Sequence, residues 1–246
     1  MLTQSARTIG KGLIETGLAA EYLAKRTAPS PLLPKSEYRL FSTAFHYGVA
    51  GNVNFDLDWR GALVAYLEDG TRDTDWGDLF VSTKLMLLSE TSSQPAIGIR
   101  SIVKLPNTSS VPYRLGSNQM DFSINALLSR DFGLVDFWLN IGFNIIGDPL
   151  TNNNQNDTYS GSTVAIIQAA PNLNFFLEVY GVTGYHDDDD KLLIRGGAVT
   201  NLIGLTWNVF GSVRPLGSNR DFGASFEASQ DWSLGVAVFK EIRIHD

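Results

Sequence analysis

A period of two in hydrophobicity runs through this chain and constrains its fold more than any other feature. Between Leu134 and Gly147, apolar side chains occupy every second position from Val135 to Ile145, and Asp136, Asn140 and Asn144 lie among the intervening positions. Successive side chains of a β-strand point to opposite faces, whereas a helix would scatter these residues around its circumference. The pattern therefore predicts a strand with one apolar face and one polar face.

Thirteen segments carry this signal, and none of them has the pattern of a substantial helix. The segment from Val53 to Glu68 is the longest, and as a single strand at ~3.3 Å per residue it would exceed about 50 Å, which is long for a soluble sheet. The other segments are 14–25, 41–49, 79–87, 97–105, 120–128, 134–147, 162–169, 173–180, 191–200, 205–214, 220–228 and 232–242.

Connections between these segments alternate in length, which is typical of an up-and-down barrel. Short ones include 50–52, 131–133 and 171–172, whereas longer polar ones include 69–77, 106–118 and 148–161. Bacterial single-chain barrels almost always have an even number of strands. We therefore predict an all-β, transmembrane, antiparallel up-and-down barrel of about 12 strands, with 10 or 14 as alternatives, and we expect 162–169 or 220–228 to lie outside the spanning wall.

The polar face distinguishes a membrane barrel from a soluble one. It mixes Asp, Asn, Ser, Gly, Arg and Tyr instead of the Lys and Glu of a solvated surface, and charged residues sit in the middle of strands. Such a face can line a wet lumen, while the apolar face meets membrane lipid. The predicted lumen-lining residues are Glu15, Glu21, His46, Asp56, Asp58, Arg60, Lys84, Arg100, Lys104, Asp136, Asn140, Asn144, Glu178 and Arg195.

These charges are expected to pair, because an isolated ion inside a barrel would be costly. The sequence predicts a cross-strand network of Asp56, Asp58 and Arg60 with Lys84, Arg100 and Lys104, and such a network would narrow the lumen. Bulky residues on the same face, Tyr66, Trp138 and Phe176, could narrow it further.

Composition excludes several classes of protein. The chain has 246 residues, no Cys and a formal net charge of -7. Thiolate metal sites and disulfides are therefore impossible, and nucleic acid is an unlikely partner because no long basic cluster is present. No apolar run approaches the ~18 residues of a membrane helix, and no signal peptide is visible. We expect one domain, 1–246, in the mature form of a bacterial outer-membrane protein, with 1–12 as a periplasmic lead-in; the sequence leaves the oligomeric state open.

The chain carries no convincing catalytic, metal or cofactor motif, so we expect no enzyme, no metal and no cofactor. His46 and Ser42 share a strand face, but their spacing is too long for direct contact and no local signature of a Ser-His-acid site is present. The run from His186 through Asp187–Asp190 could hold a divalent cation. A solvated loop tip is the simpler interpretation.

One set of motifs resembles a known family. Trp76-Gly77-Asp78-Leu79 opens one segment, Lys104-Leu105-Pro106 closes another, and Leu139–Phe143 reads LNIGF. Together with the N-terminal stretch Ser5–Gly12, these motifs resemble those of the MetA-pathway phenol-degradation proteins and of other transporter-like outer-membrane barrels. The likeness is strongest over 76–146. It implies a barrel that moves small hydrophobic or aromatic compounds. The chain departs from the family after Phe239, where members usually end on an aromatic residue.

Three functions follow from these observations. The first is passage or binding of a small hydrophobic or aromatic molecule across the outer membrane. The second is a structural or assembly barrel whose lumen is plugged by its own side chains, since small barrels are often filled in this way. The third is a soluble β-sandwich that acts as a binding module.

Overall fold

The computed structural model describes residues 2–24, 34–67, 69–108, 115, 118–147, 155–185, 189–217 and 230–244. Within these residues, no helix is long and apolar enough to cross a membrane. The strands are β1 (Leu13–Ala24), β2 (Ser36–Ala50), β3 (Val53–Trp59), β4 (Ala62–Tyr66), β5 (Arg72–Trp76), β6 (Leu79–Leu88), β7 (Ala96–Leu105), β8 (Asp121–Asp131), β9 (Val135–Gly147), β10 (Gln155–Ala170), β11 (Leu173–Gly184), β12 (Lys191–Leu202), β13 (Leu205–Gly217) and β14 (Trp232–Arg243).

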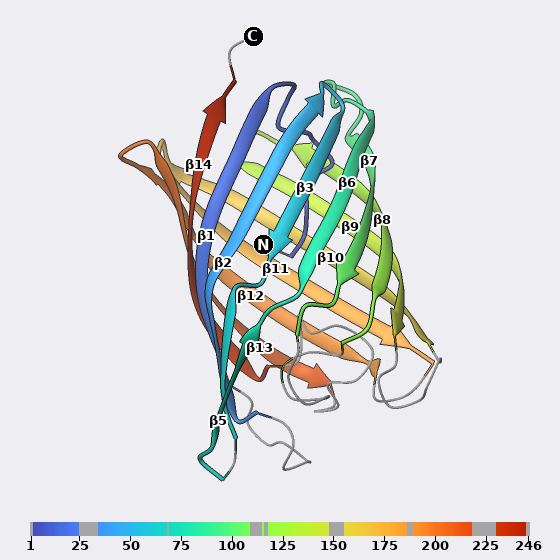
Figure 1. Ribbon diagram of the computed structural model, residues 1–246. Coiled ribbons are helices and arrows are strands. Elements are labelled where there is room, and N and C mark those ends of the chain that lie inside the picture. The colour runs from blue at the N-terminus through green and yellow to red at the C-terminus, as the bar shows by residue number, and fades with distance from the viewer. Residues whose placement is uncertain are drawn as a thin grey trace.

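The sheet closes on itself because β1 pairs with β14 on one side and with β2 on the other, both antiparallel. Twelve strands form the closed barrel, and β4 and β5 are additional. Figure 1 shows the strands arranged as one barrel. The prediction of a 12-strand antiparallel barrel is confirmed, and the alternative of a β-sandwich is wrong. We call the end that holds the connections 51–52, 132–134 and 203–204 the short-turn end, and the opposite end the long-loop end.

The structure places one of the two segments of uncertain position in the wall and adds a strand within a predicted loop. Residues 162–169 belong to β10, which at 16 residues is the longest strand, so this segment is part of the wall. Residues 220–228 lie outside the described residues. The stretch 69–77, predicted as a loop, contains β5, which pairs with β4 as a hairpin that extends the wall at the long-loop end (Figure 1).

The predicted strand from Val53 to Glu68 is interrupted at Arg60 and Gly61, where β3 ends before β4 begins. Gly61 has a φ of +72°, and the neighbouring Phe41 of β2 has a φ of +57°. The interruption reverses the alternation. Asn54 and Asp56 are buried inside the barrel before it, and Leu63 and Ala65 are buried after it. Tyr66 therefore points outward, with its ring 6.2 Å from that of Tyr38, and its predicted place in the lumen is wrong.

Gly61→Ala tests this interruption. A Cβ at position 61 would collide with the backbone of Leu40 and Ser42, and φ is already in the region that favours glycine. We expect the free energy of unfolding in lipid vesicles to fall by about 1–3 kcal/mol. Gly70→Ala is the matched control, because Gly70 has a φ of +81° with open space around its Cβ direction. Equal losses in both variants would contradict a steric role for Gly61.

The outer face of the barrel is apolar and the inner face is polar. On β9, Ile141 is 63% exposed, whereas Asn140 and Asn144 are buried, at 7% and 9%. A band of exposed apolar residues covers the outer wall and includes Leu18, Phe45, Phe55, Ile99, Ile124, Leu177, Val209 and Leu234. Aromatic rings gather on the outside near the long-loop end. The centre of the Tyr22 ring lies 4.8 Å from that of Tyr38 and 5.3 Å from that of Trp232. Amphipathic rings of this kind are typical of a membrane interface.

Candidate functional site in the barrel lumen

The barrel encloses a cavity of about 690 Å³ lined by the N-terminal residues and by inward-facing side chains of most strands. Of the fourteen residues predicted to line the lumen, twelve line this cavity: Glu15, Glu21, His46, Asp56, Asp58, Arg60, Lys84, Arg100, Lys104, Asn140, Asn144 and Arg195. The other two, Asp136 and Glu178, contact the N-terminal residues instead. Period-two alternation brought these residues together, because β-strand geometry sends alternate side chains to one face.

Residues 2–12, which we call the N-terminal segment, fold back into the lumen from the short-turn end. Sequence reasoning placed them outside, as a lead-in. The Gln4 backbone N–H donates to Asn140 Oδ1 at 2.7 Å, and Asn140 Nδ2 donates to the Gln4 carbonyl at 2.8 Å. The backbone N–H of Thr3 donates to Glu178. These contacts span more than a hundred residues of sequence, so no local pattern could have revealed them.

Further contacts along the N-terminal segment fix its position. The Lys84 ammonium donates to the Ser5 carbonyl at 3.2 Å, and the side chain of Ala6 is buried against Ala96 and Leu127. Gly48 of β2 passes so close to Gly10 that a Cβ at position 48 would overlap the Gly10 carbonyl. The N-terminal segment therefore packs closely against the inner wall and fills one end of the cavity.

Arg7 makes the strongest electrostatic contact of the N-terminal segment. Its guanidinium lies 2.6 Å from Glu90 and 2.8 Å from Asp136. Partial burial works against the charged form of both Arg7 and Glu90. The backbone N–H of Asp131 and the Arg7 guanidinium nevertheless lower the pKa of Glu90, and the two carboxylates raise the pKa of Arg7. This cluster anchors the N-terminal segment to the rim.

These directions predict a pH dependence. A carboxylate with a lowered pKa stabilises the docked segment at and above its ordinary pKa of ~4.3, and this stabilisation is lost as pH falls through the lowered value. Arg7 stays protonated throughout. We therefore expect the N-terminal segment to remain docked at neutral pH and to loosen below about pH 4, measured as increased proteolysis of residues 2–9. Glu90→Gln should loosen the segment at neutral pH, and an unchanged protease pattern in that variant would contradict the prediction.

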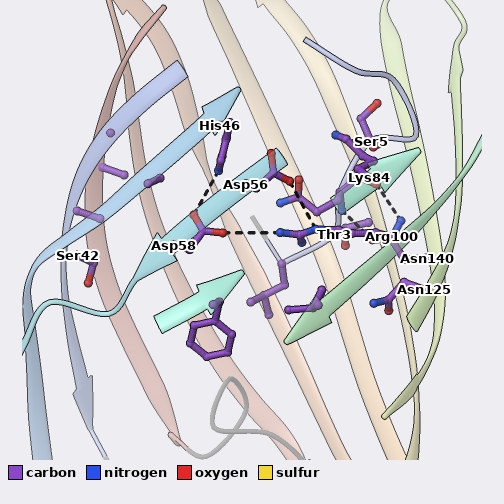
Figure 2. Close-up of a pocket in the computed structure, with 18 of the residues that line it drawn as sticks. Thr3, Ser5, Ser42, His46, Asp56, Asp58, Lys84, Arg100, Asn125 and Asn140 are labelled. Atoms are coloured by element: carbon purple, nitrogen blue, oxygen red, sulfur yellow. Dashed lines mark hydrogen bonds and ion pairs between the residues drawn. The ribbon is translucent and has the colours of Figure 1, made fainter. Parts of the chain in front are cut away.

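The predicted acid-base network is present in part. Arg100 lies 3.8 Å from Asp56 and 3.7 Å from Asp58 (Figure 2). It also donates to Ser82. Lys84 interacts electrostatically with Asp56, as predicted, and also donates to the Ser5 carbonyl of the N-terminal segment. Lys104 departs from the prediction and pairs with Asp121 and Asp78. The reason is that β7 lies between β6 and β8: Lys104 is opposite Asp121 on β8, and Asp78 directly precedes β6.

His46 lies between two carboxylates, with Nδ1 3.0 Å from Glu15 and Nε2 3.2 Å from Asp58 (Figure 2). Ser42, its neighbour on the same face, donates instead to the carbonyl of Arg60 at 2.8 Å. The serine and histidine are thus engaged by different partners. His46 joins the acidic residues of β1 and β3 across the lumen wall.

A second charged group was missed by the sequence analysis. Arg39 donates to Glu37 at 2.7 Å and lies 4.0 Å from Glu21, and Arg195 lies 3.5 Å from Glu21. Glu37 and Arg39 did not fit the alternation of 41–49 because the irregular backbone at Phe41 changes its phase. A search for alternation in either phase would have found them.

No group of three or more potential metal ligands occurs among the described residues. Of the acidic run, His186–Asp188 lie outside the described residues. Asp189 accepts from Asn156 at 2.8 Å and Asp190 accepts from Thr183 at 2.7 Å, so both carboxylates bind neighbouring strands.

No family model matches the chain, and no curated protein is similar to it in sequence, so the resemblance to MetA-pathway proteins stays a prediction. Solved structures do match. The fold is similar to that of an outer membrane channel from Pseudomonas putida F1, with a TM-score of 0.67 at 11% identity over 96% of this chain and 98% of that one. It is also similar to the NanC porin, with a TM-score of 0.57 at 8% identity over 95% and 99% of the two chains. The chain therefore has the closed antiparallel barrel fold of outer-membrane channels and porins.

Proposed function

We propose that this protein lies in the bacterial outer membrane and admits a small molecule, hydrophobic or aromatic in part, through its lumen. The observation that carries the proposal is a cavity of about 690 Å³, lined by charged and polar side chains together with aromatic rings, within a wall whose outer face is apolar. A soluble barrel would place its apolar face inward. An apolar exterior around a wet interior is the arrangement that a lipid bilayer stabilises.

The structural barrel without transport remains a second candidate, because the N-terminal segment occupies the short-turn end of the lumen. Its contacts with Asn140, Glu178 and Lys84 leave that end filled in this conformation. A channel requires that the segment can leave or shift, whereas a structural barrel does not.

Conductance in a planar bilayer separates the two candidates. A channel predicts discrete current steps, which become larger and more frequent when residues 2–9 are removed. Silence of both the full chain and the shortened chain, each shown to be folded and inserted, would contradict passage and leave the structural barrel.

A further inference from the structure

Three arginines from distant parts of the chain converge inside the cavity. Arg39 comes from β2, Arg60 follows β3, and Arg195 comes from β12. Arg39 and Arg195 lie 4.0 Å and 3.5 Å from the carboxylate of Glu21, and Arg60 interacts electrostatically with both arginines and with Glu21. We call Arg39, Arg60 and Arg195 the guanidinium cluster. All three line the cavity.

Three carboxylates of the described residues interact with the guanidinium cluster: Glu21, Glu37 and Asp58. Glu21 is shared between Arg39 and Arg195 and also accepts from Ser233 at 2.8 Å. Glu37 binds Arg39 at 2.7 Å but does not line the cavity. All three arginines line the cavity, and of the three carboxylates only Glu21 and Asp58 do.

The guanidinium cluster therefore presents more guanidinium groups than carboxylates to the cavity. Positive charge gathered behind low-dielectric walls raises the local concentration of anions and disfavours cations.

Arg195 supplies an independent observation. Its side chain is only 7% exposed, yet its Nε finds no hydrogen-bond acceptor within the part of the chain that the structure describes. A buried charged donor without an acceptor is costly, and such groups call for a ligand or water. The unmet group is a donor, which an acceptor such as a carboxylate oxygen would satisfy.

Two aromatic rings lie beside the arginines. The Arg60 guanidinium lies 4.8 Å from the centre of the Phe80 ring, and that of Arg195 lies 4.7 Å from the centre of the Phe210 ring. Both rings line the cavity. A guanidinium held near a ring keeps its planar fork of donors available for two-point binding of a carboxylate, and the ring offers apolar surface to the body of the same ligand.

We propose that the guanidinium cluster binds the carboxylate of a small aromatic acid whose ring packs beside Phe80 and Phe210. The inference rests on the proposed function and names the class of molecule that the lumen admits. An entering carboxylate would accept from Arg195 Nε in a charge-assisted hydrogen bond and pair with the guanidinium groups that face the cavity. The hydroxyl of a neutral aromatic alcohol can accept from Arg195 Nε but carries no charge to pair with the guanidinium groups, and an aromatic amine would be repelled by them.

Titration calorimetry on the full chain in detergent micelles tests the proposal with benzoate, benzyl alcohol and benzylamine as probes. We expect benzoate to bind at least about tenfold more tightly than the other two, since charge-assisted hydrogen bonds contribute about 1.5–3 kcal/mol. Arg195→Gln should weaken benzoate binding about ten- to a hundredfold and change benzyl alcohol binding by a smaller factor. Arg195→Lys, which keeps the charge but loses the fork of donors, should fall between the parent and Arg195→Gln.

Arg72→Gln is the matched control, because Arg72 is an exposed arginine of β5 outside the cavity, and it should bind benzoate as the parent does. Equal binding of benzoate and benzyl alcohol, or no benzoate binding by the folded parent chain, would overturn the proposal. Conductance is read separately. Benzoate binding by a barrel that never conducts would overturn passage alone, and conduction without preference for benzoate would overturn this inference alone.

Discussion

Removing residues 2–9 should raise the conductance of the barrel in a planar bilayer several-fold. The N-terminal segment is held by paired hydrogen bonds to Asn140, by Glu178 and by the Arg7 contacts with Glu90 and Asp136. The segment contacts side chains of the wall, whereas the wall strands pair with one another through their backbones, so the wall should close without the segment. The freed volume would join the cavity to the short-turn end.

A synthetic peptide of residues 1–10 provides the control for this deletion. Added on the side of the short-turn end, it should restore the low conductance of the full chain, and a scrambled peptide of the same composition should not. Equal conductance of the shortened and full chains, with the parent already wide open, would show that the N-terminal segment does not close the lumen.

Ile141→Arg should lower the free energy of unfolding in lipid vesicles by about 2–4 kcal/mol, the cost of a charged side chain on the lipid face near the bilayer midplane. Ile141 lies at the centre of β9, and its side chain is exposed on the outer wall. Denaturant titration followed by tryptophan fluorescence measures the loss.

Ile203→Arg is the matched control for the same exchange. Ile203 is 94% exposed in the turn between β12 and β13, beyond the apolar band. Its φ of +57° is unfavourable for a β-branched residue. Little loss, or a small gain, is expected there. If the two variants lost equal stability, the outer wall at Ile141 would not be facing lipid.

Much of the fold could be predicted because its main determinant is local. Alternation on β9 assigned Ile141 to one face and Asn140 and Asn144 to the other, and the parity of strands selected a 12-strand barrel. The reversal of faces after Gly61 could not be predicted in the same way. It depends on two neighbouring backbone irregularities, at Phe41 and Gly61, that compensate one another across separate strands.

The candidate site was predictable only where it lies on regular strands. Twelve predicted residues line the cavity, but their partners depend on strand tilt and register. Lys104 meets Asp121 and Asp78, and Lys84 meets the N-terminal segment. The segment itself has no periodicity, and its contacts become visible only when the chain is folded. Local sequence patterns do not predict contacts of this kind, because the partners are far apart in the chain.

The seam between β1 and β14 has a consequence for biogenesis. It joins Leu13–Ala24 to Trp232–Arg243, the two ends of the wall, through twelve consecutive pairs. Until the last strand has been delivered, β1 and β13 each present an open edge, and unpaired backbone groups are not tolerated in a hydrocarbon layer. A nascent chain that stops short of Trp232 should thus be unable to complete insertion. Quality control of this protein in the cell would act on the twelve residues of β14, because they convert an open sheet into a closed barrel that lipid accepts.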